Sequence, residues 1–352
     1  PDAAKSVLCY ATLLPQDGMD AETFGMALQE EEQQALDDLI DHGWLTVKDD
    51  ILTIHPVVRL VCREELKPDD TVCENFLGSV WGQYDENQYD QEKYRQLAEF
   101  YSVASDTLDD KIGNCALVAG LIWYQLGNAH QTLKYTLLAV SKKEQVFGFE
   151  HHELVSAYAN LGPAYSFLGD NRKALELHQK ALNTRLNIST VEDTYLATLY
   201  CSVGQSYTDN GDYHTAIGYL LQSLLIWKKH RPEDHPDLST IYNNLGFVYS
   251  CIEEHKLALY YFEKSLNAKG KVVPENHPKN ASCYDNIGRI HYCLGDYQKA
   301  LYYRTKALDI REQTLPRNHP SIAASYNNIS LIYSAIGDYN TSLQYQKKSL
   351  FI

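Results

Sequence analysis

The sequence predicts a mainly α-helical protein, in which a small mixed helix–strand domain precedes an α-solenoid built from repeated helix pairs. Three observations lead to this fold class. A 42-residue internal repeat runs through the chain beyond residue 110. Charge also changes there, with 25 acidic and 7 basic residues in 1–110 but 21 and 24 in 111–352. Finally, a short β-hairpin pattern interrupts the helical patterns of residues 1–68.

We therefore expect three segments. Residues 1–68 form the small domain, residues 69–110 form a helical linker or a degenerate repeat, and residues 111–352 form six repeats, the last of them truncated. The chain breaks off within helical patterns at both ends, so we expect it to be a piece of a longer protein.

A glycine that returns every 42 residues marks each repeat. It stands at Gly120, Gly162, Gly204, Gly246 and Gly288, with Ser330 at the sixth step. "STIYNNLGFVYSCI" and "HKLALYYFEKSLNAK", on either side of a short turn, both carry apolar residues at helical spacing. Each repeat is therefore predicted to be a helix, a tight turn and a second helix. A glycine in mid-helix costs about 1 kcal/mol relative to alanine, so its recurrence indicates a close helix–helix contact.

The dipeptide His-Pro also follows the repeat, at His235, His277 and His319. Proline suits the first turn of a helix, where its missing N–H has no partner anyway. Metal binding by these histidines is excluded, because stacked helices set equivalent residues about 10 Å apart. His55-Pro56 does not fall on the 42-residue period, so it has another context.

Residues 111–352 resemble tetratricopeptide repeats of the 42-residue kind found in kinesin light chains and in many bacterial signalling proteins. In the repeat that begins at Ser239, the signature positions carry Tyr242, Leu245, Gly246, Tyr249, Ala258 and Phe262. The resemblance implies a tetratricopeptide superhelix whose first helices line a concave face. It also implies a protein or peptide ligand on that face.

Candidate partner-binding residues project from the first helices. One set is polar and consists of Asn160, Asn243, Asn244, Asp285, Asn286, Asn327 and Asn328. In related arrays such carboxamides bond to the main chain of an extended peptide. They equally suit bracing between neighbouring helices, and the sequence leaves both roles open. A second set breaks the repeat pattern and is the better candidate for specificity: Gln205, Phe247, Arg289 and Leu331 in one phase, and Ser166, Thr208, Ser250, Tyr292 and Ser334 in another.

The first domain has the pattern of a winged helix. Helices are expected at residues 3–14, 20–28, 31–42 and about 56–66, and a hairpin joins "WLTV" to "ILTI". That fold commonly binds DNA through its third helix. Here, residues 20–42 contain eight acidic residues and no lysine or arginine. Such a surface repels phosphates, so we predict no nucleic acid partner.

The order "LLPQDGMDAETF", "ALDDLIDHGWLTV", "ILTIHPVVRLV" resembles the winged-helix domain of signal-transduction ATPases with numerous domains, the class that includes NOD-like receptors. In that family a Met-His-Asp motif follows the wing, and its histidine contacts the β-phosphate of ADP. Here the triplet is Ile54-His55-Pro56, which departs from the motif on both sides of the histidine. The resemblance implies nucleotide sensing by His55 in a full-length protein that binds ADP or ATP. The alternative is that His55 only caps the following helix.

Catalytic residues, a metal site and a bound cofactor are not predicted for this chain. It has no G-x-x-x-x-G-K-[ST] loop, no nucleophile elbow and no metal-binding cluster. It also lacks the run of about 20 apolar residues that a membrane span needs. Its eight cysteines include no C-x-x-C pair, and several fall at positions expected to be buried on helices. They are therefore interpreted as small core residues rather than disulfides or zinc ligands, which favours the reducing cytoplasm.

The leading functional hypothesis is the ligand-sensing and regulatory half of an ATPase switch used in signalling or defence. The array would bind a protein or peptide trigger, the winged helix would relay the event to an upstream nucleotide-binding domain, and activation would permit oligomerisation. Two alternatives remain: a transcription regulator with a peptide-sensing repeat domain, and a passive protein–protein adaptor.

Overall fold

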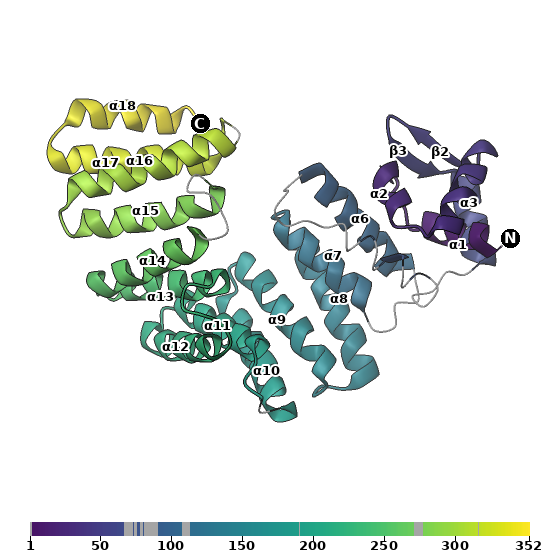
Figure 1. Cartoon of the computed structure of the whole chain (residues 1–352), viewed down its shortest axis with the longest axis horizontal. Helices are drawn as coiled ribbons and strands as arrows, with labels where there is room; N and C mark the ends of the chain where they lie inside the picture. Colours follow the sequence, from purple (N-terminus) through teal and green to yellow (C-terminus); the bar gives the residue numbers. More distant parts are fainter. Residues whose placement is uncertain are drawn as a thin grey trace. The chain divides into compact units, whose positions relative to one another are not determined.

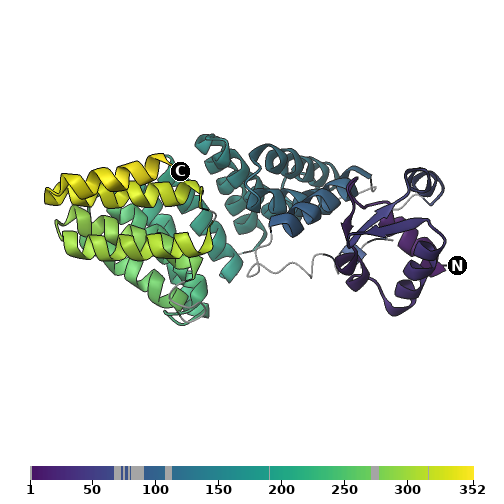
Figure 2. The same cartoon turned by 90° about the horizontal axis from the view of Figure 1, so that it is seen from above.

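The computed structural model is mainly helical and divides into two compact parts, a first part of Pro1–Ser189 and a second part of Thr190–Ile352 (Figures 1 and 2). The residues described are 2–66, 73, 76, 77, 80, 91–107, 113–189, 191–270, 277–315 and 317–352. Half of the expected linker lies outside them, including Gly78, which stands 42 residues before Gly120.

The first part begins with a small helix–strand domain. Its elements are α1 (Asp2–Ala11), β1 (Met19–Asp20), α2 (Ala21–Met26), α3 (Glu30–Asp41), β2 (Leu45–Lys48), β3 (Ile51–Ile54) and α4 (Pro56–Glu65). The four helices and the hairpin lie within a few residues of their expected positions. Strand β1 was not expected, and it completes an antiparallel sheet of order β1-β3-β2.

Local chemistry explains these boundaries. The hairpin turns at Asp49 and Asp50, which both take a left-handed backbone with φ of 52° and 64°. Such turns match the twist of the flanking strands. Asp20 caps α2 by accepting from the N–H of Thr23 at 2.6 Å. Proline at the first position of α4 starts that helix directly after the hairpin.

One aromatic side chain joins the small domain to the helices that follow. Phe76 is 2% exposed and stacks on Tyr10 of α1, with ring centroids 4.3 Å apart. Its ring also lies 5.0 Å from that of Phe24 and 6.0 Å from that of Phe100 in α6 (Gln91–Thr107). The small domain and the first helices of the array therefore share one hydrophobic core.

The rest of the chain is a series of helix pairs. In the first part they are α7 (Asn114–Gln125) with α8 (Ala129–Phe147), and α9 (His152–Phe167) with α10 (Asn171–Ile188). In the second part they are α11 (Thr194–Asp209) with α12 (Tyr213–His230), α13 (Ser239–Cys251) with α14 (His255–Gly270), α15 (Pro278–Cys293) with α16 (Tyr297–Thr314), and α17 (Pro320–Ile336) with α18 (Tyr339–Leu350). None of the described helices is both long enough and apolar enough to cross a membrane.

The recurring glycine marks a close contact between the two helices of a pair, as predicted. A Cβ added at Gly246 would lie 2.7 Å from Phe262, and one added at Gly204 would lie 2.8 Å from Leu220. The residue facing the glycine changes from repeat to repeat: Thr136, His178, Leu220, Phe262 and Arg304.

The repeated His-Pro is a helix-start device. The Nδ1 atoms of His235 and His319 accept from the backbone N–H two residues later, at 3.3 and 3.1 Å. His151, which shares their phase without a proline, does the same at 3.3 Å. At His235 the proline begins a single 3-10 turn (Pro236–Leu238), and the α-helix starts only at Ser239.

His178, which faces Gly162, makes the stability of the first part depend on pH. Burial lowers the pKa of His178 to about 4, whereas an unfolded histidine titrates near pH 6.5. Below about pH 6.5 the His178 imidazole binds a proton in the unfolded chain but stays neutral in the folded chain. The free energy of unfolding therefore falls as the pH drops toward 4. We expect a loss of roughly 3 kcal/mol over this range.

The check is urea unfolding at pH 7.5 and 4.5 of the wild type and of His178→Leu, which copies Leu220 at the equivalent position. The variant should lose less free energy of unfolding than the wild type between the two pH values. The same loss in both proteins would contradict the prediction.

Candidate functional site

The second part presents its first helices as one layer. Helix α11 contacts α13, and α13 contacts α15. The surface that α11, α13, α15 and α17 carry in common is called the first-helix face below. It holds every predicted partner-binding residue except Asn160 and Ser166, which lie on α9 in the first part.

The predicted asparagine row divides into two groups. Asn244 donates through Nδ2 to Cys201 Sγ at 3.5 Å, and Asn328 donates through Nδ2 to Asp285 at 3.4 Å. Both bonds cross from one first helix to the preceding one, so these two asparagines brace neighbouring repeats. The side chains of Asn286 and Asn327 make no hydrogen bond with another described residue. Cys283 Sγ of α15 donates to Asn243 Oδ1 of α13 at 3.9 Å, which is again a bond between two first helices. Bracing is therefore the observed role at three asparagines, and the carboxamides of Asn286 and Asn327 remain available to a partner.

The specificity row combines an aromatic ring with a cation. Arg289 Nη2 donates to Ser250 Oγ at 2.7 Å, and its guanidinium carbon lies 5.7 Å from the centre of the Phe247 ring. Phe247 is 39% exposed, and Leu331 in the same phase is 44% exposed. Gln205 bonds instead to Asp209 on its own helix, at 2.8 Å. The middle of this row therefore offers a cation between two accessible apolar side chains.

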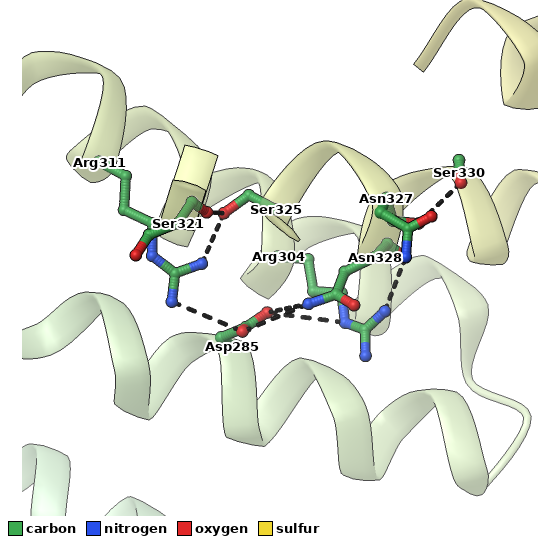
Figure 3. A network of polar contacts seen from close by, with 8 residues as sticks. All are labelled: Asp285, Arg304, Arg311, Ser321, Ser325, Asn327, Asn328 and Ser330. Carbon is green, nitrogen blue, oxygen red and sulfur yellow. Dashed lines mark hydrogen bonds and ion pairs between the residues drawn. The ribbon is translucent and has the colours of Figure 1, made fainter. Parts of the chain in front are cut away.

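Asp285 lies at the centre of a polar network that links α15, α16 and α17 (Figure 3). Its carboxylate is 3.5 Å from Nη2 of Arg311 and 3.8 Å from Nε of Arg304. Arg304 also donates through Nη1 to the carbonyl oxygen of Asn328 at 2.6 Å, and its guanidinium carbon lies 5.8 Å from the Tyr292 ring. Burial lowers the pKa of Arg304, while Asp285 acts in the opposite sense. Two guanidinium groups thus share one carboxylate.

Sequence reasoning missed Arg304 and Arg311. The sequence did contain a sign of Arg304. The position that faces the recurring glycine is apolar in the two preceding repeats, as Leu220 and Phe262, and is charged in this one. A buried charge in an apolar column needs a partner. Asp285 meets that need, where the preceding repeat has Asn243.

His55 occupies an exposed position at the start of α4, immediately after the hairpin. Its Nδ1 accepts from the N–H of Val57 at 3.3 Å, which is the geometry of the repeat histidines. The capping role is therefore real. An accepting Nδ1 assigns the ring proton to Nε2, and that atom has no hydrogen-bond partner among the described residues. The cap leaves one N–H free to donate to a ligand.

Exposed apolar side chains surround His55, and a hydrogen bond holds helix α4 in place. Trp44, whose carbonyl oxygen accepts from the N–H of His55 at 3.3 Å, is 46% exposed. Val57 and Val61 on the outer side of α4 are 62% and 51% exposed. Arg63 fixes α4 beneath them by donating to the carbonyl oxygen of Thr12 at 3.0 Å.

Metal chemistry has no support in the described ranges, which contain no group of three His, Cys, Asp or Glu side chains placed to hold an ion. Nothing in the same residues indicates catalytic activity.

Models of the tetratricopeptide repeat match residues 157–192, 195–271 and 280–350, which together make up just over half of the chain. The chain belongs to the tetratricopeptide-repeat family. Repeats of this family typically bind protein partners. The helix pair α7–α8 precedes the matched residues and has the same helix–turn–helix form.

Several solved structures share the fold. A signal transduction ATPase with numerous domains from Pyrococcus horikoshii, which has a tetratricopeptide repeat sensor, aligns over 99% of this chain and 50% of its own, with a TM-score of 0.72 and 16% identity. BtubC from P. vanneervenii aligns over 68% of this chain and 90% of its own, with a TM-score of 0.50 and 21% identity.

The Cut9–Hcn1 hetero-tetramer of the APC/C aligns over 91% of this chain and 56% of its own, with a TM-score of 0.55 and 15% identity. At these identities the likenesses show the fold alone. No curated protein sequence matches the chain.

Proposed function

We propose that the chain is the ligand-sensing and regulatory half of a signal-transduction ATPase with numerous domains. The repeats bind a protein or peptide trigger, and the N-terminal domain relays binding to a nucleotide-binding domain elsewhere in a longer, cytoplasmic protein. The observation that carries the proposal is the exposed His55 with its free Nε2–H, in a domain whose core continues through Phe76 into the repeats. The P. horikoshii likeness supports it, because it covers both the small domain and the array.

The small domain supports the relay as a winged helix. Three helices, a sheet of order β1-β3-β2 and a hairpin are the parts of that fold. The first turn of α3, the helix that would enter a DNA groove, carries Glu30, Glu31 and Glu32. These charges repel a duplex, so they favour a relay over a transcription regulator. The passive adaptor differs in predicting no nucleotide-dependent behaviour.

The mechanism is a population shift. In the resting state His55 Nε2–H would donate to the β-phosphate of ADP held by the nucleotide-binding domain, and Trp44 and Val57, which are exposed here, would pack against that domain. A trigger that binds the repeats better in the open state moves the equilibrium away from this contact. Exchange of ADP for ATP and oligomerisation follow.

The test distinguishes the helix-capping role of His55 Nδ1 from the proposed nucleotide contact of its Nε2–H. His55→Asn keeps an acceptor at the N-cap, where asparagine is among the preferred residues, but removes Nε2. In the longer protein we expect this variant to fold normally and to release ADP at least tenfold faster than the wild type, as measured by fluorescence of a labelled nucleotide.

His235→Asn is the matched control, because His235 has the same capping geometry within the repeats. It should leave ADP release unchanged. Equal ADP release rates in the wild type and in His55→Asn would refute the nucleotide-sensing role.

A further inference from the structure

Arg289 is a preorganised cation on the first-helix face. Ser250 holds one of its terminal nitrogens at 2.7 Å, and the Phe247 ring lies beneath its guanidinium. No carboxylate forms an ion pair with Arg289 within the described residues. A guanidinium fixed in this way loses little further freedom when it binds a ligand, so most of its binding energy is available to a partner.

The nearby carboxylate that could neutralise Arg289 already forms ion pairs with other residues. Asp285 lies one turn before Arg289 on α15, but its carboxylate faces Arg304 and Arg311 (Figure 3). The side chains of those two arginines are only 6% and 13% exposed. Both guanidinium groups that Asp285 pairs with are therefore largely buried, whereas Arg289 is half-buried and can be reached by a ligand.

We propose that the first-helix face selects a partner segment in which an acidic side chain binds Arg289 and a neighbouring apolar side chain rests on Phe247 and Leu331. This inference rests on the proposed sensing role of the repeats, and it names the class of ligand. Asn286 and Asn327 lie beside the same groups and supply carboxamides for the main chain of the segment.

The geometry favours a carboxylate over a phosphate group. A single guanidinium fork can donate two parallel N–H bonds to either group, so the number of accessible cations decides between them. A phosphate offers three strong acceptor oxygens and a larger charge, and it is best held by several accessible cations. Of Arg289, Arg304 and Arg311, Arg289 is the one that a ligand can reach, and apolar side chains flank it on both sides of its row.

The experiment is a selection from random twelve-residue peptides displayed on phage, carried out on the purified chain and on Arg289→Gln. Peptides selected on the wild type should be enriched in Asp or Glu next to an apolar residue. The best peptide, synthesised with a fluorescent label, should bind Arg289→Gln at least tenfold more weakly in an anisotropy titration. Its affinity for the wild type should fall as salt rises.

Lys256→Gln is the matched control, because it removes the same charge from an exposed position on α14, a second helix. It should bind the peptide like the wild type. Phe247→Ala tests the apolar half independently, and it should weaken binding without abolishing the preference for acidic peptides.

Selected peptides without acidic enrichment, or equal binding by the wild type and Arg289→Gln, would overturn the inference while leaving the repeats as a peptide sensor. Failure to select any binder would also overturn it. The ADP-release test of His55→Asn judges the ATPase switch separately.

Discussion

Replacing Asp285 by alanine should destabilise the second part of the chain by about 3–5 kcal/mol, because it leaves buried Arg304 without a counter-charge. Arg311 loses its carboxylate partner in the same step, although it keeps its 2.5 Å bond to Ser325 Oγ. Urea unfolding followed by circular dichroism measures the loss. The midpoint should fall while the dependence on urea concentration stays the same, since the area exposed on unfolding does not change.

The preceding repeat provides the compensating variant. Asp285→Asn combined with Arg304→Phe copies Asn243 and Phe262, the residues at the equivalent positions. Replacing a buried ion pair by well-packed apolar groups is often neutral or stabilising, so the double variant should regain most of the stability. Glu233→Ala is the control, since it removes an exposed carboxylate that bridges Lys228 and the half-buried Lys264, and its effect should be far smaller. A double variant as unstable as Asp285→Ala would refute this account of the network.

Phe76→Ala should destabilise the first part by about 3–5 kcal/mol, the usual cost of truncating a buried phenylalanine. The loss of stability should differ between the small domain and the helices that follow it. Phe76 touches Tyr10 and Phe24 on one side and Phe100 on the other, so its loss removes the contacts through which the small domain and α6 stabilise each other.

Hydrogen exchange measures this coupling. In the wild type, the most protected amides of α1 and α7 should open with similar free energies, because both helices contribute to one core. In Phe76→Ala, α1 should lose protection more than α7 does. Phe76→Leu keeps most of the volume and should cost less than about 1.5 kcal/mol. Equal losses of protection in α1 and α7 would show that Phe76 does not couple the two.

Much of the fold could be predicted from local patterns. The 42-residue glycine period predicted the helix pairs. The start of a second helix is also set locally, as at Asp212, whose side chain caps α12. The hairpin was also predictable from "WLTV" and "ILTI". In each case the cause lies within a few residues or repeats at a regular interval, so the sequence displays it directly.

The candidate site was predictable only in outline. Periodicity placed Asn244, Asn286, Asn327 and Asn328 on one face but could not tell bracing from binding, because the bonds that decide it join residues 43 positions apart. The exceptional charge of Arg304 could be seen in the sequence, but its pairing with Asp285 could not, since the two residues approach only when α16 packs against α15.

By itself, the sequence determined the repeat architecture, the helix caps and the acidity of the small domain, because these follow from local spacing and composition. Only the tertiary structure decided that Asp285 pairs with two arginines, that Arg289 has no carboxylate partner in the described part of the chain, and that Phe76 joins the small domain to the array. The pairing of buried charges and the packing of a core depend on contacts that form only when the chain folds. These contacts join residues that are far apart in the sequence.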